Sequence, residues 1–378
     1  MATRVKPTEG TQRLPPKTLL HVFPSFAIGG QQTRFATIAA RLDQAYRHVI
    51  VSLDGRDTAR RLLPASVDAR MLGVPRSSGP RALVAYARAI RMVRPDVLVT
   101  YNWGSIEWAI VNRLYCGLPH VHLEDGFQRD EADRQLKRRV LTRRLALRRS
   151  AVVVPSRTLA ALAVREWRLP PGRVTYIPNG IDAHRFNAVP DVRAFFDRAG
   201  ADCVIGAFAP LRAEKNLGRL LRAFARLDGT ARLVICGDGP EAAPLRALAG
   251  ELGIADRTSF TGHVQAPELV MGAFDVFAIT SDTEQMPYAV LEAMCARLPV
   301  VGTDVGDVAT MVHPDNRRFV VPRDEPERLV AALGALQSDA RLRRHLGERN
   351  RADVENRFTI DRMTSDFARI LEGAVSAA

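Results

Sequence analysis

The feature that most constrains the fold of this 378-residue chain is a repeated alternation of two kinds of segment. Short runs rich in β-branched residues, such as LLHVF, HVIVSL and DVLVTY, alternate with longer amphipathic stretches such as QTRFATIAARL. This alternation is typical of βαβ units on a parallel sheet. It stops near PNGID, residues 178–182, and begins again with CVIGAFA, LGRLLRAFARL and RLVICGDGP. The sequence therefore predicts an α/β fold with two doubly wound Rossmann-like domains.

The domain limits follow from where the alternation starts, pauses and ends. We expect a disordered tail over residues 1–17, an N-terminal domain over 18–190, a C-terminal domain over 191–357 and an amphipathic helix over 358–378. Two such domains leave a cleft between the carboxyl ends of their sheets, where α/β proteins usually bind ligands. The functional site is therefore expected between the domains.

Composition narrows the setting of the protein. With 47% hydrophobic and 25% charged residues, the chain can build two cores, and wholesale disorder is excluded. Residues 1–17 lack the apolar stretch of a signal peptide, and no segment approaches the roughly 18 apolar residues of a membrane span, so we expect a cytoplasmic protein. The cysteines form no C-x-x-C pair, which predicts small buried thiols rather than a zinc site or a disulfide framework. They are Cys116, Cys203, Cys236 and Cys295.

The formal net charge of +13 implies an anionic partner. Basic residues are densest over residues 134–149, which contain no acidic residue and whose apolar residues recur at roughly helical spacing. Such a helix fits an anionic membrane surface, with the protein peripheral on the inner face of the membrane, and it fits equally a solvated helix flank. No zinc-finger or RRM-type aromatic signature accompanies the charge, so no nucleic-acid partner is expected.

The strongest feature for chemistry is SDTEQMPYAVLEAMCARLPVV, residues 281–301, which contains Glu284 and Glu292. Proline is tolerated only near the first turn of a helix, so the helix begins at Pro287 and Glu284 lies in the loop before it. Glu292 then lies about one and a half turns into the helix. The N-terminus of this helix can present backbone N–H groups to a phosphate.

This segment resembles the glutamate-pair motif of glycosyltransferase family 4. The likeness continues in order along the chain with IGGQQT (28–33), PNGID (178–182), EKN (214–216), CGDGPE (236–241) and FTGHV (260–264). They resemble the family's glycine loop, hinge-side motif, phosphate lysine and two nucleotide-pocket loops. The resemblance implies the GT-B architecture, with the donor site built largely by the C-terminal half. It also implies a retaining, metal-independent enzyme that needs no cofactor and uses a UDP- or GDP-sugar.

The resemblance also implies roles for individual residues. Lys215 would contact the diphosphate and stabilise charge on the leaving phosphate, and Glu292 would accept hydrogen bonds from the ribose hydroxyls. Glu284 would hold hydroxyls of the transferred sugar near the reacting centre. Gly29 and Gly30 would let the backbone approach the donor phosphates. The other donor-binding candidates lie in the same motifs and are Asn179, Gly237, His263, Val264, Met286, Pro287 and Leu291.

Structural alternatives stay open for some of these residues. Lys215 would also suit the start of a helix as a solvent-exposed lysine, His263 would suit a loop as a histidine with satisfied hydrogen bonds, and the two glycines would suit a plain tight turn. The glycine loop is not the G-x-G-x-x-G of dinucleotide binding, which argues against a dehydrogenase.

Two positions depart from the family pattern, and the first precedes the lysine. Where the family usually has a glycine and an arginine, this chain has Ala209 and Pro210. Arg212 follows two residues later and would then supply the missing cation from a different angle. Loss of this phosphate contact also motivates a second reading, a noncatalytic nucleotide-sugar-binding protein.

The second departure lies in HLEDGF, residues 122–127, where the family often has a histidine directly before the glycine. Asp125 takes that place. A carboxylate there would act as a base toward the acceptor or bind a donor hydroxyl, with His122 or Glu124 sharing the work. It would equally suit the cap of the next helix.

Together these observations and the resemblance predict a glycosyltransferase that moves a sugar to a hydroxyl acceptor, and the resemblance alone implies that the transfer is retaining. Surface polysaccharide or lipid-linked glycan synthesis is the expected setting, with a glycan or lipid-linked acceptor as the partner. Besides the noncatalytic reading, a GT-B-fold nucleotide-sugar epimerase stays open, because it would share the donor pocket and need no acceptor.

Overall fold

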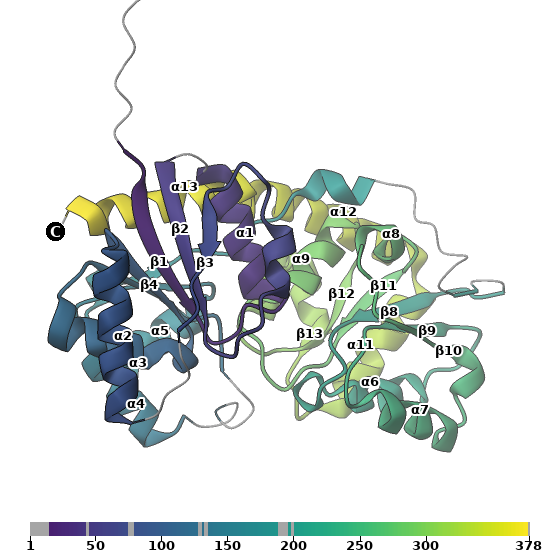
Figure 1. Cartoon of the computed structure of the whole chain (residues 1–378). Helices are drawn as coiled ribbons and strands as arrows, with labels where there is room; N and C mark the ends of the chain where they lie inside the picture. Colours follow the sequence, from purple (N-terminus) through teal and green to yellow (C-terminus); the bar gives the residue numbers. More distant parts are fainter. Residues whose placement is uncertain are drawn as a thin grey trace, which may run out of the picture.

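The computed structural model of the chain describes residues 15–42, 45–74, 79–127, 131, 135–187, 196–197 and 200–376. These residues form two α/β halves, each built on its own parallel sheet (Figure 1). The prediction of two doubly wound Rossmann-like domains is confirmed. The expected disordered tail lies outside the described residues except for its last three, and Lys17 already begins a strand. The expected boundary between residues 190 and 191 also lies outside them.

The N-terminal half is built on strands β1 (Lys17–Phe23), β2 (Tyr46–Ser52), β3 (Ala69–Met71), β4 (Val97–Tyr101), β5 (His120–Leu123), β6 (Ala151–Val154) and β7 (Val174–Tyr176). They form a seven-stranded sheet in the order β3-β2-β1-β4-β5-β6-β7. Helices α1 (Gly30–Leu42) and α13 (Ile360–Ser376) pack on one face. The other face is covered by α2 (Pro80–Val93), α3 (Ile106–Val111), α4 (Lys137–Leu147) and α5 (Arg157–Arg165).

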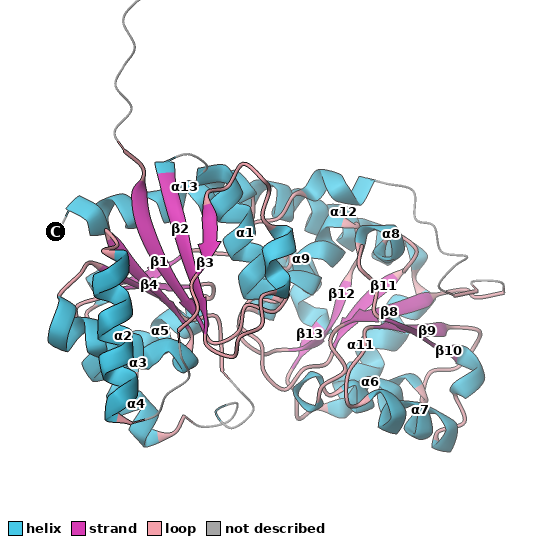
Figure 2. Ribbon diagram, in the orientation of Figure 1, coloured by secondary structure: helices cyan, strands magenta, loops and turns pink. Residues whose placement is uncertain are grey.

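The C-terminal half is built on β8 (Val204–Phe208), β9 (Arg232–Cys236), β10 (Thr258–Gly262), β11 (Val276–Ile279), β12 (Val300–Thr303) and β13 (Val320–Val321). Its six-stranded sheet has the order β10-β9-β8-β11-β12-β13. Helices α6 (Leu217–Phe224), α7 (Ala242–Glu251) and α11 (Pro326–Ser338) pack on one face. The other face carries α8 (Glu268–Met271), α9 (Tyr288–Cys295), α10 (Val308–Met311) and α12 (Ala340–Arg357). Figure 2 shows the helices and strands of both halves.

Short helical turns connect many of these elements. They are η2 (Thr58–Leu62), η3 (Trp103–Ser105), η4 (Asn112–Cys116), η6 (Pro171–Arg173), η7 (Ala183–Asn187), η8 (Ala213–Lys215), η9 (Ala255–Arg257) and η10 (Pro314–Phe319). The turn η8 matters most for the site, because it follows the central strand β8 and ends at Lys215.

The strands read as nearly continuous apolar runs because helices cover both faces of each parallel sheet. In β1, for example, Leu19, Leu20, Val22 and Phe23 have no exposed surface. Full burial of each such side chain stabilises the fold by about 1.5–3 kcal/mol. The expectation of buried thiols holds for Cys203, Cys236 and Cys295, whereas Cys116 is half-buried.

The C-terminal helix α13 returns to the N-terminal half (Figure 1). Its buried residues Met363, Phe367 and Leu371 join the core beneath α1. The crossing point is tight, because a Cβ at Gly180 would lie 2.6 Å from the carbonyl oxygen of Thr359. The two halves are therefore tied together by the end of the chain as well as by the linker.

The basic run expected over residues 134–149 forms the shorter helix α4. For Arg143 the expectation of a surface cation is wrong, because its side chain is buried. It makes two hydrogen bonds of 3.1 Å to Glu131 and one of 3.3 Å to Glu124, and it lies over the ring of Trp167. Burial of this arginine is stable because its charge is paired. Within the described part of the chain, none of the helices combines the length and the apolar character that crossing a membrane requires.

Candidate functional site

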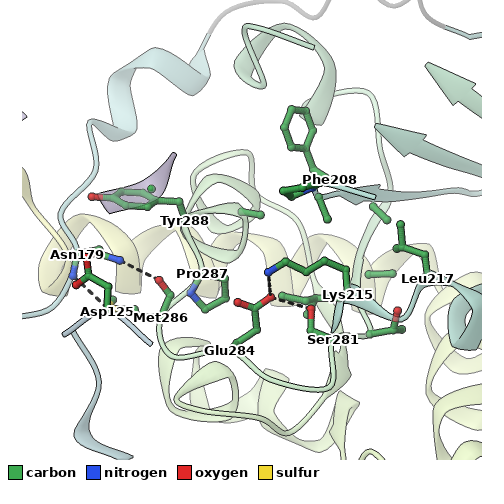
Figure 3. Close-up of a pocket in the computed structure, with 18 of the residues that line it drawn as sticks. Asp125, Asn179, Phe208, Lys215, Leu217, Ser281, Glu284, Met286, Pro287 and Tyr288 are labelled. Carbon is green, nitrogen blue, oxygen red and sulfur yellow. Dashed lines mark hydrogen bonds and ion pairs between the residues drawn. The ribbon is translucent and has the colours of Figure 1, made fainter. Parts of the chain in front are cut away.

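A cavity of about 310 Å³ lies between the two halves, at the carboxyl ends of both sheets. Parallel sheets place their ligand sites at this edge because the loops that follow the strands meet there. Both halves line the cavity, the N-terminal one mainly through α1 and the loops after β5 and β7 (Figure 3). The predicted site residues that line it are Gly30, Asp125, Asn179, Lys215, Glu284, Met286 and Pro287.

The cavity's C-terminal wall carries an ion pair between Lys215 and Glu284. Lys215 lies at the end of η8, and its Nζ is 2.5 Å from Oε1 of Glu284, which lies in the loop after β11. The hydroxyl of Ser281 donates a 2.7 Å hydrogen bond to the same carboxylate oxygen. Figure 3 shows the two charged side chains meeting inside the cavity. Lys215 is therefore not the solvent-exposed lysine of the structural alternative.

Helix α9 begins one residue after the predicted start. Its first residue is Tyr288, directly after Pro287, so Glu284 lies in the preceding loop. Tyr288 and Ala289 line the cavity. The first N–H groups of a helix have no partner within the helix. The start of α9 therefore offers hydrogen-bond donors and the positive end of a helix dipole beside Lys215.

Glu292 lies farther along α9 and outside the 310 Å³ cavity. Burial raises the pKa of its carboxyl to about 7; nearby Arg185 lowers the pKa and Glu268 raises it. Arg185 itself donates two hydrogen bonds of 2.8 Å to Glu268. Near neutral pH, Glu292 can therefore gain or lose a proton easily.

Asp125 in the cavity's N-terminal wall forms a second ion pair with Arg34, which is buried and is not itself a lining residue. Nη1 of Arg34 lies 3.1 Å from Oδ1 of Asp125, and Nη2 donates a 3.0 Å hydrogen bond to the carbonyl of Ile177. The N–H of Asp125 donates to Oδ1 of Asn102 at 2.7 Å. Sequence reasoning missed Arg34. The available signal was an arginine on the apolar face of a predicted amphipathic helix, next to Phe35.

Three polar atoms of the cavity residues are buried and have no hydrogen-bond partner among the described residues. They are Oδ2 of Asp125, Nε2 of Gln31 and the hydroxyl oxygen of Tyr288. Burial raises the pKa of Tyr288 well above its usual value, so its hydroxyl stays protonated. An acceptor, a donor and a hydroxyl that can do both form a surface complementary to the hydroxyl groups of a sugar.

The structure does not bring His122 to the cavity. It has no exposed surface. Its Nδ1 is 2.7 Å from the hydroxyl of Thr100, and its Nε2 is 3.5 Å from Oε2 of Glu124. Glu124 is equally buried and pairs with Arg143. This network stabilises the inside of the N-terminal half, so the expectation that His122 or Glu124 shares the work of Asp125 is corrected.

Other predicted residues lie around the cavity rather than in its lining. Arg212 and His263 are exposed, whereas Val264 and Leu291 are buried in the C-terminal half. Gly237 has φ +141°, and a Cβ there would lie 1.8 Å from the carbonyl oxygen of Ala209, so the loop requires a glycine. Pro210, by contrast, lines the cavity where the family pattern has a cation.

The two glycines of the first loop differ in their roles. A Cβ at Gly30 would make only an ordinary van der Waals contact, 3.4 Å, with the ring of Tyr288, so the approach of α1 to the start of α9 does not itself require a glycine. Gly29 lies just before α1, and a Cβ there would meet the side chain of Gln32 at 3.0 Å instead.

Comparison with known proteins matches both halves of the chain to glycosyltransferases. Residues 192–353 match the family Glycosyl transferases group 1, and residues 29–180 match the Glycosyl transferase 4-like domain. The chain belongs to the family-4-like glycosyltransferases of GT-B fold. Its two matched regions meet at the cleft that contains both ion pairs.

Curated relatives share part of the chain. A GDP-mannose-dependent alpha-(1-6)-phosphatidylinositol monomannoside mannosyltransferase of Mycobacterium tuberculosis is 30% identical over 54% of this chain and 57% of that protein. The chain thus spans little more than half of that relative. A 2-deoxystreptamine N-acetyl-D-glucosaminyltransferase of Streptomyces fradiae is 28% identical over 74% of this chain and 71% of its own length.

Solved structures agree on the fold. HepE of Anabaena, crystallised in complex with UDP, superposes with a TM-score of 0.81 at 18% identity, covering 94% of this chain and 100% of that one. WaaG, a glycosyltransferase involved in lipopolysaccharide biosynthesis, gives a TM-score of 0.72 at 18% identity over 93% and 99%. At this identity the likeness concerns the arrangement of the two domains.

Proposed function

We propose that this glycosyltransferase moves a sugar from a UDP- or GDP-sugar to a hydroxyl acceptor, with retention of the anomeric configuration and without a metal ion. The observation that carries the proposal is the Lys215–Glu284 pair beside the start of α9, inside the cleft of a GT-B fold. A cation and a helix N-terminus favour the diphosphate of the donor, and a carboxylate next to them favours the hydroxyls of its sugar.

When the donor binds, its diphosphate replaces Glu284 as the ionic partner of Lys215. Glu284 keeps the hydrogen bond from Ser281 and gains an open side for a hydroxyl of the sugar. As the bond from the sugar to the diphosphate breaks, negative charge grows on the leaving phosphate, and Lys215 stabilises it. Glu284 carries negative charge near the sugar ring, which favours an oxocarbenium-like transition state.

The side of the cavity opposite this ion pair binds the hydroxyl groups of the sugar. Oδ2 of Asp125, Nε2 of Gln31 and the hydroxyl of Tyr288 are buried and unpaired within the described residues, so a sugar hydroxyl entering the cavity satisfies them. Buried polar groups without partners are costly, and a ligand that pairs them gains that free energy. Asp125 is tied to Arg34, which favours its role as a hydrogen-bond acceptor.

Acceptor binding involves α4. A groove of about 980 Å³ runs between the halves and is lined by Lys137, Leu141 and Arg144 of α4 as well as by Glu284. On α4, Leu141 and Leu145 are exposed, and Lys137 and Arg138 lie beside them. Exposed apolar residues among cations suit an anionic membrane surface on the cytoplasmic side, where a lipid-linked acceptor would enter this groove.

Surface polysaccharide or lipid-linked glycan synthesis is the setting that this acceptor suggests. Among the relatives, the mycobacterial protein is named a phosphatidylinositol monomannoside mannosyltransferase. A Rhizobium meliloti protein, 27% identical, is named for lipopolysaccharide core biosynthesis. The alternative of a noncatalytic binding protein rests on Pro210, which lines the cavity in place of a cation.

The donor is tested with a panel of UDP- and GDP-sugars, first by thermal stabilisation and then by product analysis. A ligand of the native state raises the unfolding temperature. We expect one nucleotide sugar to stabilise the protein and to be hydrolysed slowly in water or transferred when acceptor is supplied. Stabilisation without hydrolysis or transfer would favour the noncatalytic reading, and isomerised donor would favour an epimerase. No stabilisation by any member would contradict the proposal.

The membrane contact is tested by co-sedimentation with vesicles of neutral lipid alone or mixed with anionic lipid. Wild type should sediment only with anionic vesicles and be released by salt, because each cation near the surface adds about 1 kcal/mol and salt screens it. Changing the exposed Lys137, Arg138 and Arg148 to Gln should abolish sedimentation. The control changes three exposed arginines of the C-terminal half, Arg317, Arg341 and Arg344, to Gln. If both variants lost sedimentation equally, the net charge of the protein, and not α4, would explain its binding to vesicles.

A further inference from the structure

The N-terminus of helix α5 is capped from the other half of the molecule. Within its own chain segment, α5 has Ser156 as N-cap, which accepts a 3.0 Å hydrogen bond from the N–H of Leu159. The N–H groups of Arg157 and Thr158 instead donate to the two carboxylate oxygens of Asp307, at 2.7 and 3.0 Å. The hydroxyl of Thr158 donates a further 2.8 Å hydrogen bond to Asp307. The free donors of the first turn are thus satisfied across the cleft.

Asp307 is fixed to the loop that carries Glu284. Its N–H donates a 2.9 Å hydrogen bond to the carbonyl of Gln285. Its neighbour Gly306 has φ +58°, and a Cβ there would lie only 2.2 Å from the carbonyl oxygen of Glu284. The two backbones are therefore in direct contact. A displacement of Asp307 must displace Glu284 and Gln285 with it.

The N-terminal half also holds this loop at two further points. The hydroxyl of Ser156 donates a 2.7 Å hydrogen bond to Oε1 of Gln285. On the other side, Nδ2 of Asn179 donates a 2.9 Å hydrogen bond to the carbonyl of Met286. Gln285 and Asn179 are both buried. Two consecutive residues of the loop, Gln285 and Met286, are thus hydrogen-bonded to the opposite half, and Gln285 is bonded to Asp307 as well.

We infer that Asp307 is a positioning residue that closes the cleft and thereby sets the place of Glu284. A carboxylate is favoured at a helix N-terminus because it complements both the unpaired N–H groups and the dipole. Asp307 meets that partner only when the two halves are together. If the halves separate, the backbone N–H groups of Arg157 and Thr158 in α5 lose the carboxylate of Asp307 as their acceptor. The loop that carries Glu284 then also loses its contact with α5 through Asp307. The effect on turnover rests on the proposed function, whereas the effect on closure does not.

The experiment compares Asp307→Ala and Asp307→Asn with Asp339→Ala. Asp339 is the matched control, because it caps α12 with two hydrogen bonds of 2.9 Å but lies within the C-terminal half. Turnover is measured with UDP-glucose and GDP-mannose, as kcat and KM. The radius of gyration is measured by small-angle scattering with and without UDP or GDP.

For Asp307→Ala we expect kcat to fall roughly tenfold to a hundredfold, because a misplacement of about 1 Å costs that much, while the KM for the donor changes much less. The radius of gyration should rise relative to wild type. Asp307→Asn keeps one acceptor oxygen, so its kcat and its radius of gyration should both lie between those of Asp307→Ala and wild type. Asp339→Ala should change neither, although it lowers the unfolding temperature.

Two results would overturn the inference. One is a radius of gyration for Asp307→Ala equal to that of wild type with and without nucleotide. The other is an equal loss of kcat in Asp307→Ala and Asp339→Ala, which would mean that general destabilisation explains the loss. If wild type turns over neither donor, the full panel of nucleotide sugars decides the proposed function, and the scattering comparison alone decides whether Asp307 closes the cleft.

Discussion

The two walls of the cavity each carry a carboxylate paired with a cation, and the pairs differ in how firmly they are held. Arg34 and Asp125 have side chains that are 2% and 18% exposed, and Arg34 is also bonded to the backbone of Ile177. Lys215 and Glu284 are 20% and 11% exposed, and the lysine is the more accessible partner. An arginine with two fixed partners is a rigid support, whereas a lysine is a flexible point charge.

The difference suggests a division of work across the cleft. The N-terminal pair stays intact and offers the free oxygen of Asp125 to a ligand. In the proposed function the C-terminal pair exchanges its partner, because a diphosphate would compete with Glu284 for Lys215. Substitutions that remove one cation at a time should therefore have different consequences, one mainly for stability and the other mainly for rate.

The largest effect is expected for Arg34→Met. Removing one partner of a buried ion pair leaves an unpaired charge and destabilises a protein by about 3–5 kcal/mol. Urea unfolding measures the loss. The control is Arg41→Met on the same helix, whose arginine pairs with Asp361 in an exposed position and should contribute about 0–1 kcal/mol. Similar losses in both variants would show that Arg34 is not a rigid support.

Lys215→Ala comes next and should lower the transfer rate on the order of a hundredfold, because a charge that stabilises the leaving phosphate is lost. The free energy of unfolding of Lys215→Ala should differ from that of wild type much less than that of Arg34→Met does. Lys17→Ala removes an exposed lysine paired with Asp96, outside the cavity lining, and serves as the control. A near-normal rate in Lys215→Ala would contradict the role of the pair and would mean that another cation stabilises the leaving phosphate.

A smaller effect is expected for Glu292, which belongs to neither pair. Glu292→Ala should weaken nucleotide binding about tenfold, the loss expected when hydrogen bonds to a charged group disappear, while Glu284→Ala should chiefly lower kcat. Calorimetric titration and steady-state kinetics separate the two. If both variants bound nucleotide as tightly as wild type, Glu292 would have no ribose to hold.

The raised pKa of Glu292 adds a test of sign. Burial keeps the carboxyl partly protonated near pH 7, and accepting hydrogen bonds from hydroxyls favours the ionised form. Nucleotide binding between pH 6 and 7 should therefore release protons, detected as heats that depend on the buffer. Because the pKa is higher in the folded state, Glu292 favours folding at acid pH, and its contribution is lost as pH rises through about 7. Glu292→Gln should abolish both effects.

The sequence predicts the C-terminal wall better than the N-terminal wall, for a physical reason. Local geometry places Glu284, because Pro287 marks a helix start and Glu284 lies in the loop before it. Lys215 is 69 positions away from Glu284, and the resemblance of its motif to a known family assigns it to the same site. The Arg34–Asp125 pair joins residues that are 91 positions apart, and no local pattern relates them.

The histidines and the basic helix show the same limit. His122 follows the alternation of a strand, and the sequence does not reveal which face of the sheet it occupies. Nor does it reveal that His122 pairs there with Glu124, which in turn pairs with Arg143. The contact of Asp307 with α5 is likewise invisible in the sequence, because it depends on how two domains meet.

The central claim is that the cavity binds a nucleotide sugar through Lys215, and calorimetric titration of UDP and GDP tests it most directly. Wild type, Lys215→Ala and Arg212→Ala are compared, since Arg212 is exposed and lies outside the cavity lining. We predict that one nucleotide binds wild type, that Lys215→Ala weakens its binding at least about tenfold, and that Arg212→Ala leaves it nearly unchanged. Undiminished binding by Lys215→Ala, or no binding of either nucleotide to wild type, would contradict the account.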